Sequence, residues 1–158
     1  MREHYPQKLS LKINMIRQAI LEDSRIAAQL AMLLWPDNEI SQLEEDMKEY
    51  IDSNNGAVFI YFDETTPVGF AQCGLRHDYV EGTQSSPVGY LEGIFVKEEY
   101  QRRCIAKKLL AQCEEWAKAQ GCSEFASDCE LTNIDSLKFH LQIGFEETNR
   151  IICFKKKL

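Results

Sequence analysis

The spacing of apolar residues changes several times along the chain, and each change predicts a new element of secondary structure. Ile26, Leu30 and Leu33 recur at intervals of three or four residues, which is typical of one face of a helix. Residues 57–62 form a short apolar run instead, and they are expected to make a hairpin with the strand that follows. The expected strands cover 13–20, 57–62, 68–76, 88–96 and 124–129, with one or two closing strands in 145–155, and the expected helices cover 24–35, 41–52, 105–120 and 132–141.

Proline and glycine mark where the predicted helices end. Pro36 stops the first helix, because a proline cannot continue the hydrogen-bonded backbone. Asn54-Asn55-Gly56 is expected to close the second helix, and Gly121 and Gly144 to end the third and fourth, since glycine readily takes the left-handed conformation found there.

The order of these elements predicts the fold class. One strand, two helices and three strands are followed by helix, strand, helix and closing strand, so hairpins precede a later strand–helix–strand crossover. This mixture indicates an α/β protein with a mixed central sheet and helices on both faces. Thr132 is expected to cap the last helix, with Asp135 as its capping-box partner. We expect residues 1–12 to form a polar tail and 13–158 a single domain.

Charge and composition narrow the classes of function. The formal net charge is −7, which disfavours nucleic-acid binding and favours cationic partners, although such a charge also simply keeps a protein soluble. No apolar run is long enough to span a membrane, and the N-terminus lacks the apolar core of a signal peptide. The six cysteines have neither disulfide-framework nor zinc-site spacing, so we expect reduced thiols, a cytoplasmic protein and no metal.

A polar loop between a strand and a helix carries the first candidate chemistry. Residues 101–106 enter the helix predicted from Ile105, where free backbone N–H groups and the helix dipole favour an anion such as pyrophosphate. Arg102, Arg103 and Lys107 add positive charge in an otherwise acidic chain. The alternative is a charged helix start that faces solvent.

Two carboxylates form the second candidate. Glu92 interrupts an apolar strand and, by alternation, shares a face with Tyr90, Ile94 and Val96, where it needs a cation or hydrogen-bond donors. Asp128 ends a neighbouring strand, a common position for ligand-binding side chains. The alternative for Glu92 is an edge strand on which its side chain points to water. The alternative for Asp128 is a structural role in a turn or as a helix cap.

Two motifs resemble those of the GNAT acetyltransferase superfamily. Gln101 and Ala106 match the acyl-CoA loop Q/R-x-x-G-x-G/A, with Cys104 in place of the central glycine. Asn133, Ser136, His140, Gly144 and Phe145 follow a second family pattern. The resemblance implies acetyl-CoA bound between splayed fourth and fifth strands. The implied contacts are Ile94, Phe95, Val96, Arg102, Arg103, Cys104, Ile105, Ala106, Lys107 and Asn133, with His140 protonating the departing thiolate.

Longer segments are similar to the aminoglycoside 6′-N-acetyltransferases over residues 13–158. They are Leu34-Trp35-Pro36, residues 77–82, Ser85-Ser86-Pro87, residues 91–96, Ala126-Ser127-Asp128 and residues 144–148. The resemblance implies a homodimer that acetylates the 6′-amine of an aminoglycoside and confers resistance. The implied substrate contacts are Trp35, Tyr79, Glu92, Asp128 and Asn149, the last standing where relatives often carry an acidic residue.

The expected mechanism is direct transfer in a ternary complex. Glu92 or Asp128 would take the ammonium proton through water, and a backbone N–H of residues 94–96 would polarise the thioester carbonyl. A route through Cys104 or Cys129 would need a neighbouring base. Two rival functions are an acetyltransferase for a polyamine or protein N-terminus and a non-catalytic acyl-CoA-binding module, the latter favoured by Cys104.

Overall fold

The computed structural model describes residues 13–158, so the predicted tail over 1–12 lies outside the described residues. Four of the predicted strands and all four predicted helices are present to within a few residues. The elements are β1 (Asn14–Gln18), η1 (Leu21–Asp23), α1 (Ser24–Leu34), α2 (Ile40–Asp52), β2 (Gly56–Asp63), β3 (Thr66–Arg76), β4 (Val88–Val96), η2 (Glu98–Tyr100), α3 (Ile105–Ala119), β5 (Phe125–Ala126) and α4 (Ile134–Gln142).

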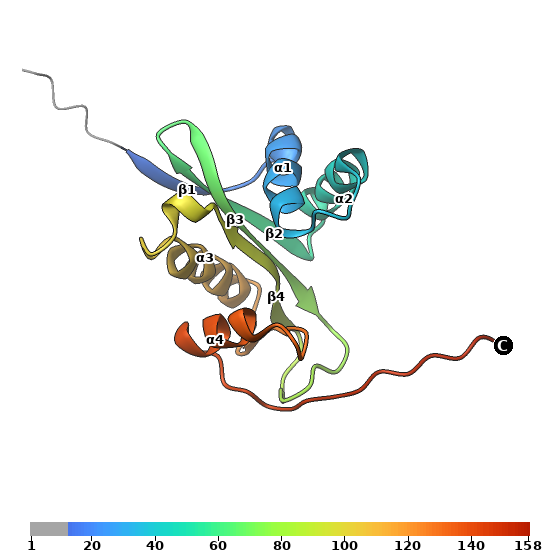
Figure 1. The fold of residues 1–158 in the computed structure, drawn as a ribbon. Coiled ribbons are helices and arrows are strands. Elements are labelled where there is room, and N and C mark those ends of the chain that lie inside the picture. The colour runs from blue at the N-terminus through green and yellow to red at the C-terminus, as the bar shows by residue number, and fades with distance from the viewer. Residues whose placement is uncertain (1–12) are drawn as a thin grey trace, which may run out of the picture.

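The strands form one mixed sheet in the order β1-β2-β3-β4-β5. The first four strands pair antiparallel with their neighbours, and β5 pairs parallel to β4 after the crossover through α3. Helices α1 and α2 lie on one face of the sheet and α3 on the other (Figure 1). The predicted α/β architecture with helices on both faces is therefore confirmed.

The alternating residues of β2 explain why its sequence is continuously apolar. Phe59 and Tyr61 belong to the core beneath α3, whereas Val58 and Ile60 belong to the core beneath α1 and α2. A strand covered on both faces has no solvent side to carry polar residues. In the part of the chain that the structure describes, no helix is both long and apolar enough to cross a bilayer.

The C-terminal part of the predicted sheet is wrong. The strand expected over 124–129 pairs for only two residues, and residues 145–158 form no strand. The last residues of the chain instead run away from the body of the molecule in Figure 1. No strand of the described residues pairs with them, and pairing is what turns an apolar stretch into a strand.

Two predicted helix caps are also wrong. Gly56 is the first residue of β2 rather than a helix C-cap, and its missing Cβ leaves room for the Tyr50 ring, which a built Cβ would approach to 2.5 Å. The N-cap of α4 is Asn133, whose side-chain oxygen accepts from the Ser136 backbone N–H at 3.0 Å, in place of Thr132. Gly121 and Gly144 follow α3 and α4 with φ of +90° and +102°, as predicted.

An ion pair fixes β1 to the start of α1. The Asp23 carboxylate is buried at 5% exposure, where it accepts from the Arg17 guanidinium and from the Ile20 backbone N–H at 2.9 Å. The hydrogen bond from Arg17 holds the pKa of the Asp23 carboxyl below its usual value. A buried carboxylate requires such partners, because an unpaired one would lose its hydration without compensation.

We expect Asp23→Asn to lower the free energy of unfolding by about 1–3 kcal/mol at pH 7, because it removes a charge-assisted hydrogen-bond pair. The folded-state pKa is depressed, so the contribution is complete above the unfolded pKa of about 3.9 and disappears as pH falls through the folded value. Urea unfolding of both proteins from pH 7 to pH 3 measures this. Asp46→Asn, on exposed α2, is the control, and a difference that grows below pH 4 would contradict the assignment.

Candidate functional site

A β-bulge places Glu92 at the point where β4 separates from β5. Gln72 lies opposite Gly93 and Cys73 lies opposite Leu91, so Glu92 is the extra residue of β4. The parallel pairing with β5 is confined to Gly89 and Tyr90 of β4, which lie just before the bulge. An extra residue bends and twists its strand. The β4–β5 ladder therefore ends next to the bulge, and the bulge also changes the direction of the Glu92 carboxylate.

The bulge overturns the predicted alternation along β4. Ile94 and Val96 pack into the core beneath α3, whereas a Cβ on Gly93 would meet the Trp35 ring beside α1 at 2.7 Å. Leu91, the residue before Glu92, belongs to the same core as Ile94 and Val96, so Glu92 lies on the opposite face, where it pairs with Arg76. The prediction that Glu92 needs a cationic partner is confirmed.

Arg76, at the end of β3, joins Glu92 to Tyr90. Its Nη2 donates to both carboxylate oxygens of Glu92, at 2.8 and 2.9 Å, and its Cζ lies 4.3 Å from the centre of the Tyr90 ring. The Tyr90 hydroxyl donates to Asp128 Oδ2 at 2.5 Å. Burial and this hydrogen bond raise the pKa of Tyr90, which keeps its proton. One network therefore links the two predicted carboxylates.

A pocket of about 460 Å³ opens beside this network, and it is lined by Leu75, Arg76, His77, Asp78, Tyr79, Val80, Glu81, Tyr90 and Asp128. Three of these residues are acidic, which suits a cationic ligand. No cluster of potential metal ligands occurs among residues 13–158.

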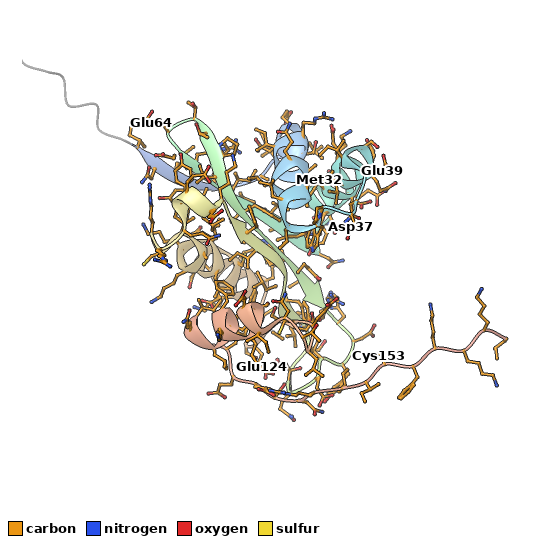
Figure 2. All side chains as sticks on the ribbon, viewed as in Figure 1. Met32, Asp37, Glu39, Glu64, Glu124 and Cys153 are labelled. Carbon is orange, nitrogen blue, oxygen red and sulfur yellow. The ribbon has the colours of Figure 1, made fainter. Side chains whose placement is uncertain are left out.

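Glu124 holds the loop that forms one wall of the pocket. Its Oε1 accepts from the backbone N–H groups of Gln84 and Ser85, both at 2.8 Å, and from the Ser85 hydroxyl at 2.6 Å. The Ser85 hydrogen bond is the largest of the effects that lower the pKa of Glu124. Figure 2 labels Glu124 near the lower end of the molecule. The loop is thus tied to β5 before any ligand binds.

The segment after α4 packs on the same loop. The Asn149 side-chain nitrogen donates to Glu81 Oε1 at 3.0 Å, and a Cβ on Gly82 would meet Thr148 at 2.5 Å. Gly82 has a φ of +80°, a conformation that glycine adopts without strain. Asn149 is therefore joined to the pocket wall through Glu81 rather than lining the pocket itself.

The two predicted aromatic contacts have different surroundings. Trp35 is half-buried at the end of α1, where its ring meets Phe70 edge-on with centroids 6.2 Å apart. Tyr79 is exposed on the pocket loop. Trp35 thus supports β4 next to the bulge as part of the core, whereas Tyr79 can offer its ring to a ligand.

His140 contacts Ser127, which follows β5. Its Nδ1 lies 2.7 Å from the Ser136 carbonyl oxygen, and its Nε2 lies 2.9 Å from Ser127 Oγ. A carbonyl accepts only, so Nδ1 carries a proton. The Ser127 hydroxyl donates to the Leu91 carbonyl oxygen of β4 at 3.3 Å. The dyad therefore spans the place where β4 and β5 part.

The loop before α3 has the backbone conformation that an anion cradle needs. Arg102 and Cys104 have φ of 61° and 58°, and Cys104 is exposed. Cys104 precedes the first residue of α3, and no side chain from the described residues caps this helix. The Gln101 side chain donates to the Val96 carbonyl at 3.0 Å and ties the loop to β4. Cys104 thus takes the conformation for which glycine is usual, with its side chain turned outward.

The other predicted cofactor contacts divide between β4 and the two helix starts. Phe95 packs on the core beneath α1 and α2, and Ile94 on the core beneath α3. Arg103 donates to the Glu99 carbonyl at 3.2 Å and stacks on Tyr100, which turns it back toward η2. The side-chain oxygen of Asn133 caps α4, which leaves its NH₂ group to donate to a ligand.

Three side chains of this site were not selected from the sequence: Arg76, Tyr90 and Ser127. Arg76 ends β3, Tyr90 lies near the start of β4, and Ser127 follows β5. Their importance depends on the register of β3 and β4 and on the bulge, which no local pattern reveals. The one available signal was Glu92 itself, since a carboxylate in an apolar strand requires a cation.

The fold and the loop before α3 define an acyltransferase scaffold, and the comparisons agree. The model of the Acetyltransferase (GNAT) family matches residues 27–145, and the chain belongs to this family.

Curated relatives and solved structures are similar over most of the chain. The aminoglycoside N(6′)-acetyltransferase type 1 of Serratia marcescens is 40% identical over 142 residues, covering 88% of this chain and 97% of the relative. That of Stenotrophomonas maltophilia is 42% identical over 144 residues, covering 90% and 93%. The structure of AAC(6′)-Iy with the bisubstrate analogue CoA-S-monomethyl-acetylneamine superposes with a TM-score of 0.88 at 38% identity, covering 92% of this chain and 99% of that one. The structure of AAC(6′)-Iy with CoA superposes with a TM-score of 0.89 at 37% identity, covering 93% of this chain and 97% of that one.

We expect Cys104→Val to lower the free energy of unfolding by about 1–3 kcal/mol, because a β-branched residue is strained at positive φ. Cys153→Val, at an exposed cysteine in the extended C-terminal segment (Figure 2), should change it by less than about 0.5 kcal/mol. Urea unfolding measures both. Equal effects at the two cysteines would show that the conformation at Cys104 is not the cause.

Proposed function

We propose that this protein transfers the acetyl group of acetyl-CoA to the 6′-amino group of aminoglycosides and thereby confers resistance to them. The single observation that carries this is the acidic pocket beside the β4 bulge, which Asp128 and Tyr90 line together with Arg76, the partner of Glu92. A polycationic sugar suits such a pocket better than a peptide N-terminus, because several carboxylates lie within one small volume.

The residues around the α3 start fit a nucleotide pyrophosphate. Backbone N–H groups over Cys104 to Lys107 and the positive end of the α3 dipole would hold the phosphates, with Arg102 contributing charge. The β4 backbone at 94–96, which does not pair with β5, would pair with the pantetheine arm, and the Asn133 NH₂ group would donate to it. When bound, acetyl-CoA supplies an activated thioester as the acetyl donor.

The amine arrives protonated and must lose its proton before it attacks the thioester. Glu92 and Asp128 are the two carboxylates placed to accept that proton, directly or through water. Asp128 is the more accessible in the free protein, because Arg76 covers Glu92. A β4 backbone N–H at 94–96 would donate to the carbonyl oxygen as negative charge develops on it. Trp35 stabilises this geometry by packing on Gly93.

His140 carrying a proton on Nε2 would return it to the departing thiolate through Ser127, whose hydroxyl releases its own proton to the sulfur as it takes up the one from the ring. The Ser127 hydroxyl contacts both His140 Nε2 and the Leu91 carbonyl. We therefore place Ser127 as the group through which His140 acts. The aromatic neighbours Phe139 and Phe145, with centroids 5.7 and 5.3 Å from the His140 ring, hold it in position.

Steady-state kinetics with kanamycin and acetyl-CoA test this function, and mass spectrometry locates the acetyl group. We expect acetylation at the 6′-amine, and a fall of about 10²–10⁴ in kcat/KM for whichever of Glu92→Gln and Asp128→Asn removes the base. Glu45→Gln, on exposed α2, is the control and should leave kcat/KM unchanged. Turnover of a peptide N-terminus but of no aminoglycoside would overturn the proposal.

We also propose that one domain over residues 13–158 forms a homodimer in the cytoplasm. Ile151, Ile152 and Phe154 are 66%, 80% and 91% exposed on the C-terminal segment, and β5 pairs along only two residues. Exposed apolar residues and an unpaired strand edge each favour association with a second copy. All six cysteines are free, which suits a reducing compartment.

The double variant Ile152→Glu/Phe154→Glu should be monomeric at micromolar concentration by light scattering, because two charges would enter the apolar contact. Lys156→Glu changes the net charge by the same amount on the same segment and should remain dimeric. A dimer that survives the double variant would place the interface elsewhere.

A further inference from the structure

Arg76 occupies a place suited to a ligand cation. Its guanidinium lies against the Glu92 carboxylate and over the face of the Tyr90 ring, and Tyr90 in turn leads to Asp128. A carboxylate together with an aromatic face is a favourable binding site for an ammonium group. Arg76 is also the only arginine or lysine in the pocket wall, all of which lies in the described part of the chain.

The guanidinium covers the carboxylate on the pocket side. Arg76 lines the pocket and Glu92 does not. The Arg76 side chain is 47% exposed, against 27% for Glu92. A substrate amine that is to reach Glu92 must therefore meet Arg76 first.

The contact is of the kind that a ligand can break. A single nitrogen, Nη2, reaches both oxygens of Glu92, whereas the strongest arginine–carboxylate pairs use two parallel N–H donors. Half-exposed ion pairs contribute little net free energy, and an exposed cation–π contact adds a similarly small amount. Arg76 thus holds Glu92 weakly enough for a ligand amine to displace it.

The geometry points to Arg76 as a tethered competitor for the substrate ammonium, which occupies the cation site of Glu92 and Tyr90 and moves aside when an amine binds. This inference rests on the proposed function for its choice of ligand. Displacement lowers the apparent affinity by a factor that depends on Arg76 and Glu92, not on the ligand. Every amine that uses Glu92 is therefore weakened equally, and amines with few other contacts fall below a useful affinity.

Calorimetry without acetyl-CoA tests this, with kanamycin and with 6-amino-6-deoxyglucose, a single-ring amine. We expect Arg76→Gln to bind both ligands about three- to tenfold more tightly, and by the same factor. In a Glu92→Gln background, Arg76→Gln should have a much smaller effect, since the carboxylate for which the two cations compete is gone. In kinetics, Arg76→Gln should lower the KM for kanamycin.

Arg25→Gln is the matched control. It removes one positive charge and breaks an exposed Arg25–Glu44 pair at the same 2.8 Å, but on α1 and α2 away from the pocket. It should leave both affinities unchanged, and Arg76→Lys should stay near the parent.

Each other outcome overturns the inference. Arg76→Gln could increase the affinity more for kanamycin than for the single-ring amine, and do so in the Glu92→Gln background as well. That result would mean that Arg76 stays in place and only repels cations. Weaker binding or a lower kcat in Arg76→Gln would make it a positioning residue, and absence of binding by either ligand to every variant would show that the pocket is not a cation site. Binding of kanamycin without acetyl transfer would instead overturn only the proposed function.

Discussion

The irregularity of β4 at Glu92 is the constraint from which the site follows. One extra residue between Leu91 and Gly93 interrupts the ladder with β3, and the parallel pairing with β5 stops beside it. The same bulge turns Glu92 toward Arg76 while Ile94 and Val96 stay in the core beneath α3. A sheet without this defect would bury the carboxylate or expose it alone, and would leave no backbone free at 94–96.

The rigid surroundings of the bulge explain how a shallow pocket keeps its shape. Trp35 packs on Gly93 from one side. Glu124 accepts three hydrogen bonds from the loop that forms the pocket wall. Asn149 joins the C-terminal segment to the same loop through Glu81. Substrate positioning of this kind supplies much of the rate gain in a transfer between two bound reactants.

Charge in the pocket has two opposing parts. Asp78, Glu81 and Asp128 attract a polycation, whereas Arg76 opposes any cation that approaches Glu92. In the free protein the Arg76 guanidinium also meets the need of a half-buried Glu92 for a positive partner. Affinity for an amine therefore depends on how many other carboxylates it reaches, which favours ligands with several amino groups.

The sequence by itself determined the order of elements, the two-sided core, the acyl-CoA loop and the choice of Glu92 and Asp128, because these depend on local periodicity and on residue chemistry. It did not determine that β5 is two residues long, that residues 145–158 remain unpaired, or that Asn133 caps α4. The partnership of Arg76 with Glu92 joins residues sixteen positions apart, and that of Ser127 with His140 joins different elements. Only the tertiary structure decided these contacts, because they depend on strand register and on where a bulge falls, which a one-residue shift would reverse.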